Sequence, residues 1–377
     1  MDRLVLTLNA GSSSLKYALF DAAAECTVLE RGNLDHHPGD KGTLLDEVHT
    51  RLTAKLGDQV WSHLAAVSHR VVHGGPRYFD PTVATAEVLA ELRSFTALDP
   101  EHLPAEIALI EAAAAKFPVL PQVACFDTAF HRHLPRAAQL LPLPRRYQAQ
   151  GVRRYGFHGL SCQFLLQELV RREDLAARRG RVILAHLGSG ASVTAVKDGR
   201  SFDTSMGFTP AAGLVMGTRT GDLDPGLIAY LARTENMDAA QFDHLINHES
   251  GLLGVSGQSA DLRVLTAREA TDPAAADAVE LFCYQVRKFI GAYAAALGGL
   301  DTLVFSAGIG EHMPAIRERI CTGLAFLGIT LDETANAANA ALISAPAGQV
   351  AVRVIATDEE LILARSALAF LSPPPVS

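Results

Sequence analysis

The chain lacks the cysteine pattern of a disulfide framework or a metal centre. Its 377 residues contain 5 cysteines, an odd number, and no two of them are spaced as a Cys-x-x-Cys pair. Cys26, Cys125, Cys162, Cys283 and Cys321 are scattered along the chain, which predicts free thiols in a reducing cytoplasm. The first residues enter a predicted strand without the basic region and apolar core of a signal peptide. We therefore expect a cytoplasmic protein.

Long uncharged apolar stretches and clusters of basic residues are also missing. No stretch is apolar enough to span a bilayer, so no membrane partner is expected. The net charge is -8, and no run of Lys and Arg could neutralise a nucleic-acid backbone, so no nucleic-acid partner is expected. Hydrophobic residues make up 49%, which is ordinary for a globular enzyme, and the length allows two domains. Bound phosphates would have to be met by a few local cations, loop amides and a metal.

A hairpin pattern does occur, and it occurs twice. Residues 5–21 and 183–199 each contain an apolar run, a short turn of Gly and Ser, and a second apolar run. Backbone N–H groups in such a turn can approach an anion closely, because Gly has no Cβ. One copy alone fits an ordinary hairpin as well as a phosphate loop. The pairing, with a third Gly-rich turn at 305–311, predicts a duplicated fold that holds a polyphosphate between two halves.

Strand and helix patterns alternate along the chain and predict an α/β fold. Further strands are expected at 65–72, 119–126, 302–305 and 350–355, and helices at 44–56, 100–116, 160–172, 274–296 and 359–371. Residues 134–154 read as an irregular connector. The Gly-rich segment 209–224 is long for a structureless loop, which favours a functional role. Asp127 directly follows a predicted strand, and such positions hold ligands in α/β folds.

Eight motifs, in order and nearly end to end, resemble those of the acetate kinase family. They are Leu8-Asn9-Ala10-Gly11-Ser12-Ser13-Ser14-Leu15-Lys16, His69-Arg70-Val71-Val72-His73-Gly74-Gly75, Phe126-Asp127-Thr128-Ala129-Phe130-His131, Tyr155-Gly156-Phe157-His158-Gly159, Met206-Gly207-Phe208-Thr209-Pro210, Met216-Gly217-Thr218-Arg219, Gly254-Val255-Ser256-Gly257 and Ala307-Gly308-Ile309-Gly310-Glu311. The family belongs to the superfamily of actin, sugar kinases and heat-shock chaperones. The resemblance implies two actin-like (ribonuclease H-like) domains from a duplicated βββαβαβα unit, with the nucleotide cleft between them. The N-terminal domain would span 1–126, completed by the C-terminal helix 360–372, and a second domain at 127–359 would carry the adenosine pocket.

The reaction of the family implies a small set of catalytic residues. It moves the γ-phosphoryl of ATP to acetate, giving acetyl phosphate and ADP. A carboxylate is ionised at neutral pH and needs no general base, but it must approach another anion. Arginine suits this because its planar fork binds carboxylate and phosphoryl oxygens bidentately. By resemblance, Arg70 and Arg219 contact the carboxylate and the transferring phosphoryl group. His158 would donate a hydrogen bond to that group, and Asp127 would orient an arginine or the metal shell.

The resemblance also implies residues that bind nucleotide, acyl group and metal. The first phosphate loop comprises Asn9, Ser12, Ser14 and Lys16, the second comprises His186, Gly188, Ser189 and Gly190, and the adenosine pocket comprises Asp261, Leu262, Arg263, Gly308, Ile309, Gly310 and His312. Val72, Phe157 and Pro210, with Arg70, would bind the short carboxylate. Asn9 and Glu359 would hold Mg²⁺, or Mn²⁺ in its place. The family further implies a homodimer.

Each catalytic assignment has a simpler structural alternative. Arg70 or Arg219 alone could belong to a salt bridge, and His158 alone could be a core histidine with a backbone partner. Glu359 lies at the start of a predicted helix, where the helix dipole favours a carboxylate. The motifs around these residues favour the functional interpretation.

Four departures from the motifs leave the acid and the nucleotide open. Ser189 and His312 each stand where the family has Asn, and Cys162 stands where it has His. Glu101 and Leu103 change the family's Pro-Leu-His-Asn-Pro motif. Glu101 would bring a carboxylate beside an anionic substrate unless it turns to solvent or pairs with a cation. A propionate or butyrate kinase therefore stays an alternative, as does a non-catalytic ATP-dependent switch on the same fold.

Overall fold

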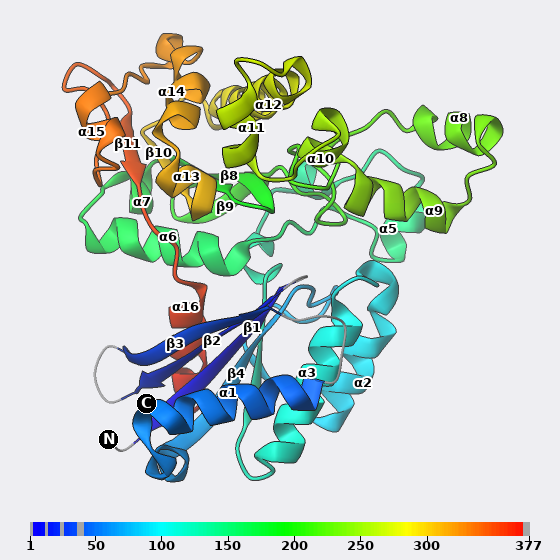
Figure 1. The fold of residues 1–377 in the computed structure, drawn as a ribbon, viewed down its shortest axis with the longest axis vertical. Helices are drawn as coiled ribbons and strands as arrows, with labels where there is room; N and C mark the ends of the chain where they lie inside the picture. Colours follow the sequence, from blue (N-terminus) through cyan, green and yellow to red (C-terminus); the bar gives the residue numbers. More distant parts are fainter. Residues whose placement is uncertain (1–2, 12–13, 23–25, 36–40, 372–377) are drawn as a thin grey trace. The chain divides into compact units, whose positions relative to one another are not determined.

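Figure 1 shows a computed structural model, which describes residues 3–11, 14–22, 26–35 and 41–371. The chain divides into two compact units. The first unit comprises Met1–Phe130, Gly159–Phe164 and Asp358–Ser377, and the second unit comprises His131–His158 and Leu165–Thr357. These units differ from the domains predicted at 1–126 and 127–359, because residues 127–130 and 159–164 belong to the first unit.

The first unit is built on a sheet with the strand order β3-β2-β1-β4-β6-β5. Its strands are β1 (Leu4–Ala10), β2 (Ser14–Asp21), β3 (Thr27–Asp35), β4 (Leu64–Val71), β5 (Thr82–Val83) and β6 (Gln122–Phe126). β1, β2 and β3 form an antiparallel meander, whereas β4 runs parallel to β1 and β6 runs parallel to β4. The carboxyl ends of β1, β4 and β6 therefore meet at one edge of the sheet, where parallel α/β sheets bind ligands.

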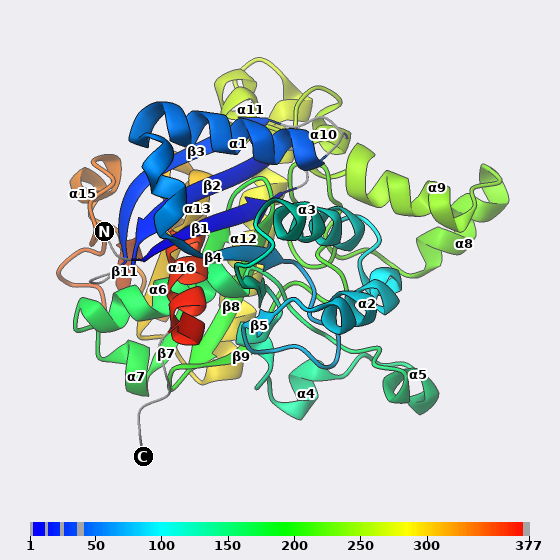
Figure 2. The same cartoon turned by 90° about the horizontal axis from the view of Figure 1, so that it is seen from below.

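Helices cover both faces of this sheet. They are α1 (Lys41–Leu56), α2 (Ala86–Ser94), α3 (Leu103–Lys116) and α16 (Glu359–Leu371), with the 3₁₀ turns η1 (Asp58–His63), η2 (Thr96–Leu98) and η3 (Ala129–His131). Alternate residues of β1 point to opposite faces. Leu6 and Leu8 pack with α1 and α3, whereas Val5 packs with α16. Figure 2 shows α1 and α16 on opposite sides of the strands.

The second unit has a sheet of its own with the strand order β11-β10-β7-β8-β9. Counted from β9, this order repeats that of β3, β2, β1, β4 and β6 in the first sheet. Its strands are β7 (Arg181–Leu187), β8 (Ala191–Lys197), β9 (Arg200–Thr204), β10 (Thr302–Ser306) and β11 (Ala351–Val354). Three antiparallel strands are again followed by two parallel ones. The duplication predicted from the two hairpins is therefore confirmed.

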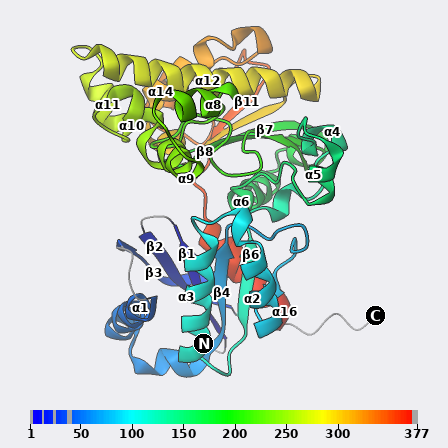
Figure 3. The same cartoon turned by 90° about the vertical axis from the view of Figure 1, so that its right-hand side faces the viewer.

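A single long helix covers one face of the second sheet. α12 (Pro273–Leu297) has 25 residues and lies against β7 and β8 (Figure 3). Asp272 caps its start by accepting hydrogen bonds from the N–H groups of Ala274 and Ala275. The other helical segments are α4 (Arg136–Gln139), α5 (Arg145–Ala149), α6 (Gly159–Arg171), α7 (Ala176–Arg179), α8 (Gly226–Thr234), α9 (Ala239–His244), η4 (Leu245–Glu249), α10 (Gly251–Ser256), α11 (Leu262–Arg268), α13 (Ala307–His312), α14 (Pro314–Thr322), η5 (Ala325–Leu327) and α15 (Glu333–Ala337).

Several sequence expectations need correction. The prediction of a third Gly-rich turn at 305–311 is wrong, because residues 307–312 form the helix α13 directly after β10. The helix expected from residue 100 begins at Leu103, with Pro104 in its first turn. The connector at 134–154 contains the short helices α4 and α5. No helix within the described ranges is long and apolar enough to cross a membrane.

Candidate active site

Arg70 and Asp127 form an ion pair where β4 and β6 end side by side. The Nε and Nη2 of Arg70 donate to Asp127 Oδ2 over 2.9 and 2.6 Å. Its Nη1 donates to the carbonyl oxygen of Ala10 over 3.0 Å. Asp127 is fully buried, and its N–H donates to the carbonyl oxygen of Val71 over 3.0 Å. Asp127 thus fixes one edge of the Arg70 guanidinium.

Glu106 of α3 also belongs to this cluster, and the sequence analysis missed it. Its Oε1 lies 3.6 Å from Arg70 Nη1, and its Oε2 accepts a hydrogen bond from Val72 N over 2.8 Å. The signal was present: Glu106 lies at helical spacing from Leu103 and Ile110, on the buried stripe of α3. A carboxylate on such a stripe needs a partner, because a buried unpaired charge is costly.

The charges in this cluster shift one another's pKa values. Burial raises the pKa of the Glu106 carboxyl to about 7, against the opposing effect of Arg70. Burial would lower the pKa of Arg70, but Asp127, Glu106 and Glu359 together raise it above its ordinary value. The Arg70 guanidinium therefore stays charged. Three carboxyl groups, those of Asp127, Glu106 and Glu359, act on this one cation.

A second acidic group surrounds Asn9, at the end of β1. Asn9 Nδ2 donates to Glu359 Oε2 over 2.9 Å and to Glu360 Oε1 over 3.1 Å. Burial and the neighbouring Asp127 raise the pKa of Glu359 to about 7, although Arg70 opposes this shift. The predicted pair Asn9 and Glu359 is thus brought together, and Glu360 joins it.

The surplus of carboxylates fits a divalent cation. Asp127 Oδ1 is buried and has no hydrogen-bond partner within the described part of the chain, and burial and Asp127 favour protonation of Glu359. Within the described residues, no three His, Cys, Asp or Glu side chains cluster closely enough to hold a metal. Mg²⁺ commonly takes one or two protein oxygens and completes its shell with water and substrate phosphates. Asn9 and Glu359 match that mode.

The turn between β1 and β2 contains the first predicted phosphate loop. Gly11 N donates to the carbonyl oxygen of Ser14 over 2.8 Å. Lys16 is exposed on β2 and pairs with Asn9 across the ladder, so both side chains lie on one face. Ser12 lies outside the described residues.

His158 is held in an uncommon backbone conformation in the second unit. Its φ is 58°, a left-handed value that few residues other than glycine adopt. Its Nδ1 lies 2.9 Å from Ser192 Oγ, and its ring stacks on that of His186 with centroids 4.2 Å apart. Strain of this kind persists where the surroundings over-determine a side chain, often at functional sites. The predicted residues His158 and His186 are therefore neighbours.

The second hairpin turn lies against both His158 and Arg219. A Cβ placed on Gly190 would be 3.3 Å from His158 Nε2 and 3.7 Å from Arg219 Nη1. The backbone near Arg219 is held separately, since Met216 N donates to the Arg219 carbonyl oxygen over 3.1 Å. Three predicted residues from distant parts of the sequence thus meet at one point.

We expect Gly190→Ala to impair the enzyme while leaving its fold intact. The added methyl group would shift His158 by a few tenths of an ångström, which should lower kcat about tenfold, since about 1 Å of misplacement costs about 100-fold. Gly291→Ala is the matched control, because nothing lies within 4 Å of a Cβ at that helical position. Steady-state kinetics and thermal melting of both variants check this. An unchanged kcat for Gly190→Ala would show that the turn is not close to the reacting groups.

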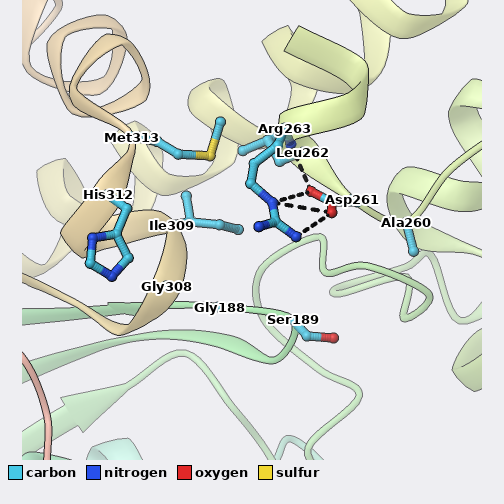
Figure 4. A pocket seen from close by; sticks show the side chains of 10 residues that line it. All are labelled: Gly188, Ser189, Ala260, Asp261, Leu262, Arg263, Gly308, Ile309, His312 and Met313. Atoms are coloured by element: carbon cyan, nitrogen blue, oxygen red, sulfur yellow. Dashed lines mark hydrogen bonds and ion pairs between the residues drawn. The ribbon is translucent and has the colours of Figure 1, made fainter. Parts of the chain in front are cut away.

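A pocket of about 450 Å³ in the second unit matches the predicted adenosine site. It is lined by Gly188, Ser189, Ala260, Asp261, Leu262, Arg263, Gly308, Ile309, His312 and Met313 (Figure 4). Asp261 caps α11 by accepting from Arg263 N over 2.9 Å, and it also binds the Arg263 guanidinium. Ala260 and Met313 were not predicted. Gly310 does not line the pocket, because it faces Phe305 and Ala185.

The residues predicted to bind the acyl group fall in both units. Val72 is buried directly after β4, in the first unit. Phe157 is buried in the second unit, where its carbonyl oxygen accepts from His131 Nε2 over 3.0 Å. Pro210 is half-buried in the same unit. Their grouping in one acyl pocket stays a prediction.

The residues that depart from the family motifs have contrasting surroundings. Glu101 is exposed on the turn before α3, whereas Leu103 is buried in the core with Leu92 and Phe126. Cys162 is buried in α6. Ser189 and His312 line the pocket of the second unit.

Comparisons with known proteins agree with this geometry. A sequence model of the Acetokinase family matches residues 33–365. The acetate kinase of Rhodopseudomonas palustris is 47% identical over 390 residues, covering 97% of this chain and 98% of that protein. The crystal structure of Porphyromonas gingivalis acetate kinase matches with a TM-score of 0.88 and 36% identity, covering 98% of this chain and 100% of that one. A propionate kinase structure from Francisella tularensis matches with a TM-score of 0.87 and 35% identity, covering 97% and 98%. These likenesses confirm the predicted fold of two actin-like domains, and the chain belongs to the acetokinase family.

Proposed function

We propose that this protein is a cytoplasmic acetate kinase, which transfers the γ-phosphoryl of ATP to acetate and forms acetyl phosphate and ADP reversibly. The observation that carries the proposal is the pair of arginines in family motifs. Arg70 is held by Asp127 in the first unit, and Arg219 lies beside His158 in the second. Phosphoryl transfer to a ready-made nucleophile needs positioning and charge cancellation more than covalent help, and these groups supply both.

Arg70 would bind the carboxylate of the acid. Asp127 accepts from Nε and Nη2 and so occupies one edge of the guanidinium. Because the guanidinium is planar and one edge is fixed, its other edge keeps a defined direction. That edge can meet a carboxylate with two parallel hydrogen bonds. The charge of Arg70 also offsets the repulsion between the acid and the phosphates.

His158 and Arg219 would stabilise the phosphoryl group in transit. When the Ser192 hydroxyl donates to His158 Nδ1, the ring proton lies on Nε2, the atom that faces Gly190 and Arg219. A neutral imidazole can then donate one hydrogen bond to a phosphoryl oxygen. Arg219 supplies the cation that transition-state charge requires.

The 450 Å³ pocket would hold the adenosine part of ATP. Its volume falls in the usual range for small-ligand sites, roughly 300–1,000 Å³. The turn at 188–190 contributes to the pocket wall and also approaches His158, which would connect base and phosphate binding. Asn9 and Glu359 would hold Mg²⁺ or Mn²⁺, which neutralises phosphate charge when bound.

A homodimer, expected from the family, is part of the proposal. α8 has no buried residue, and it exposes Leu227, Ile228 and Tyr230. Exposed apolar side chains on one short helix are typical of a contact surface. We propose that a second copy of this chain covers them.

Propionate is the second candidate substrate, because the chain is 35% identical to a propionate kinase of the same fold. Glu101 was the departure that most directly put acetate in doubt. We expect Glu101→Leu to change KM for acetate and for propionate by less than about twofold, because the side chain is exposed on a turn and surface changes have small effects. Measurement of both KM values checks this. A several-fold drop in either value would place Glu101 at the acyl group.

The function is tested by trapping the product. Purified protein with ATP and Mg²⁺ should form acyl phosphate that hydroxylamine captures as a hydroxamate, with acetate, propionate and butyrate compared by kcat/KM. Acetate should give the largest value. Preference for propionate or butyrate would reassign the substrate. Slow ATP hydrolysis that no acid stimulates would instead favour a non-catalytic nucleotide switch.

A further inference from the structure

Two buried carboxylates, rather than one, contact Arg70. Asp127 occupies one edge of the guanidinium at 2.6 Å, and Glu106 Oε1 lies 3.6 Å from Nη1. The side chains of Asp127 and Glu106 are 0% and 3% exposed. When both carboxylates are ionised, these three side chains carry one negative charge more than Arg70 balances, before any substrate binds. An anionic acid bound to Arg70 would add another in the same desolvated space.

Glu106 is held so that one oxygen faces Arg70. Oε2 accepts a hydrogen bond from Val72 N over 2.8 Å, which fixes the carboxyl group at the end of β4. Oε1 is buried and has no hydrogen-bond partner among the described residues, and it forms an ion pair with Arg70 Nη1. A proton on Oε1 would therefore cost no existing hydrogen bond.

The other charged groups around Glu106 do not remove the surplus. On its own helix and the turn before it, His102 Nδ1 lies 2.9 Å from Asp99 Oδ1, so these two groups satisfy each other. The charged residue of β4 that faces Glu106 is Arg70. Asp127, at the end of β6, pairs with Arg70 in turn. The charge near Arg70 therefore changes with the ionisation of Glu106, and Glu359 is a further carboxyl group that acts on Arg70.

We propose that Glu106 is a positioning residue for Arg70, and that it takes up a proton from solvent when the anionic acid binds, so that carboxylate affinity depends on pH. This inference rests on the proposed role of Arg70 as the partner of the acid. An ionised Glu106 attracts Nη1 and repels the incoming carboxylate. A protonated Glu106 leaves the charge of Arg70 to the substrate while its Oε2 still holds Val72 N.

The direction of the pH effect follows from the ionisation of Glu106. Burial raises its pKa to about 7, so it is protonated below that pH and ionised above it. Affinity for acetate should therefore fall as the pH rises through neutrality. A substrate that shifts the pKa by about one unit would change the affinity about tenfold.

The test compares the wild-type protein with Glu106→Gln, which keeps the size and an acceptor for Val72 N but cannot ionise. KM for acetate is measured from about pH 6 to about pH 9, with saturating MgATP, across the range in which the carboxyl titrates. Glu111→Gln is the matched control, because Glu111 is an exposed residue of the same helix that pairs with Arg93. Glu106→Asp, which keeps the charge, covers the case in which Glu106→Gln folds poorly.

We expect KM for acetate to rise about five- to tenfold with pH in the wild type and in Glu111→Gln, and about twofold or less in Glu106→Gln. Glu106→Asp should keep the rise, and KM for ATP should change equally in all four proteins. A purely structural role would alter stability but leave the pH profile of KM unchanged. Parallel profiles in the wild type and Glu106→Gln would overturn the inference.

A second measurement does not depend on activity. Because the folded pKa of Glu106 is raised, its contribution to stability is present below the ordinary Glu pKa of about 4.3 and is lost as the pH rises from there to about 7. The melting temperature of Glu106→Gln should therefore gain on that of the wild type between about pH 4 and about pH 7, and a constant difference across that range would contradict the inference. If the wild type forms no acyl phosphate with any acid, the proposed function fails and the inference fails with it. If the wild type forms acyl phosphate but the pH profiles of KM coincide in the wild type and Glu106→Gln, the proposed function stands and the inference about Glu106 is wrong.

Discussion

Replacement of Arg219 by alanine is expected to lower kcat by at least about two to three orders of magnitude, the usual effect of removing a cation that stabilises a transferring phosphoryl group. Arg219 Nη1 lies near the hairpin turn at Gly190, to which His158 Nε2 also points. Alanine removes the only cation among these three residues. Initial rates of acyl phosphate formation under saturating substrates measure the loss.

The fold should survive this substitution, because the loop is held through its backbone. Met216 N donates to the Arg219 carbonyl oxygen, and Thr220 N donates to that of Ile246 over 3.0 Å. Arg219→Lys should recover only part of the rate, because lysine lacks the planar fork. Arg51→Ala serves as the control, because Arg51 is about half exposed on α1 and pairs with Glu47 on the surface. A near-normal kcat for Arg219→Ala, with unchanged melting, would remove Arg219 from the mechanism.

Arg70→Met is expected to damage both stability and activity. Removal of one partner from a buried ion pair leaves uncompensated charge and costs about 3–5 kcal/mol. Asp127 and Glu106 would both lose their cation. The pKa of Glu106 would rise further, because Arg70 no longer opposes the effect of burial, so the destabilisation should be smallest at low pH and grow as the pH rises through neutrality. Binding of acetate should be lost over the whole range.

Denaturant unfolding at several pH values checks this expectation. Arg93→Met is the control, because Arg93 pairs with Glu111 on the surface, where both side chains are about half exposed. Surface pairs contribute only about 0–1 kcal/mol. If Arg70→Met and Arg93→Met were equally stable at every pH, the buried cluster would not be the charged network described above.

Much of the fold followed from local patterns. The two hairpins could be predicted because each combines apolar runs of strand length with a turn of small residues, and both properties are local. Asp127 could be placed at the end of a strand, at the sheet edge where α/β folds bind ligands. Its contact with Arg70 joins residues 57 positions apart, yet the parallel pairing of β4 and β6 brings them together.

Other features depend on tertiary contacts that no local pattern contains. Residues 307–312 read as a Gly-rich turn, but they form α13, which packs against β7 and β10. A Cβ on Gly310 would lie 3.3 Å from the backbone of Phe305, so a small residue is needed for that close packing rather than for a turn. Packing outweighs the low helix propensity of glycine here.

Glu106 illustrates the same limit within the active site. Its helix was predicted, but the partner of its carboxylate, Arg70, lies 36 residues earlier on the strand β4. A lone acidic residue on an apolar stripe signals that a partner exists without identifying it. For Glu101, the motif indicated a position near the substrate, and the structure shows an exposed residue on a turn, so its distance from the acyl group stays a prediction.

In the proposed reaction, phosphate passes from ATP to a carboxylate and not to water. Phosphorus NMR of the protein with ATP, Mg²⁺ and acetate distinguishes the two, because acetyl phosphate and inorganic phosphate give separate signals. We expect the acetyl phosphate signal to grow together with that of ADP, to require acetate, and to be nearly absent with Arg219→Ala. Formation of inorganic phosphate alone, at a rate that acetate does not change, would show that the protein is not an acetate kinase.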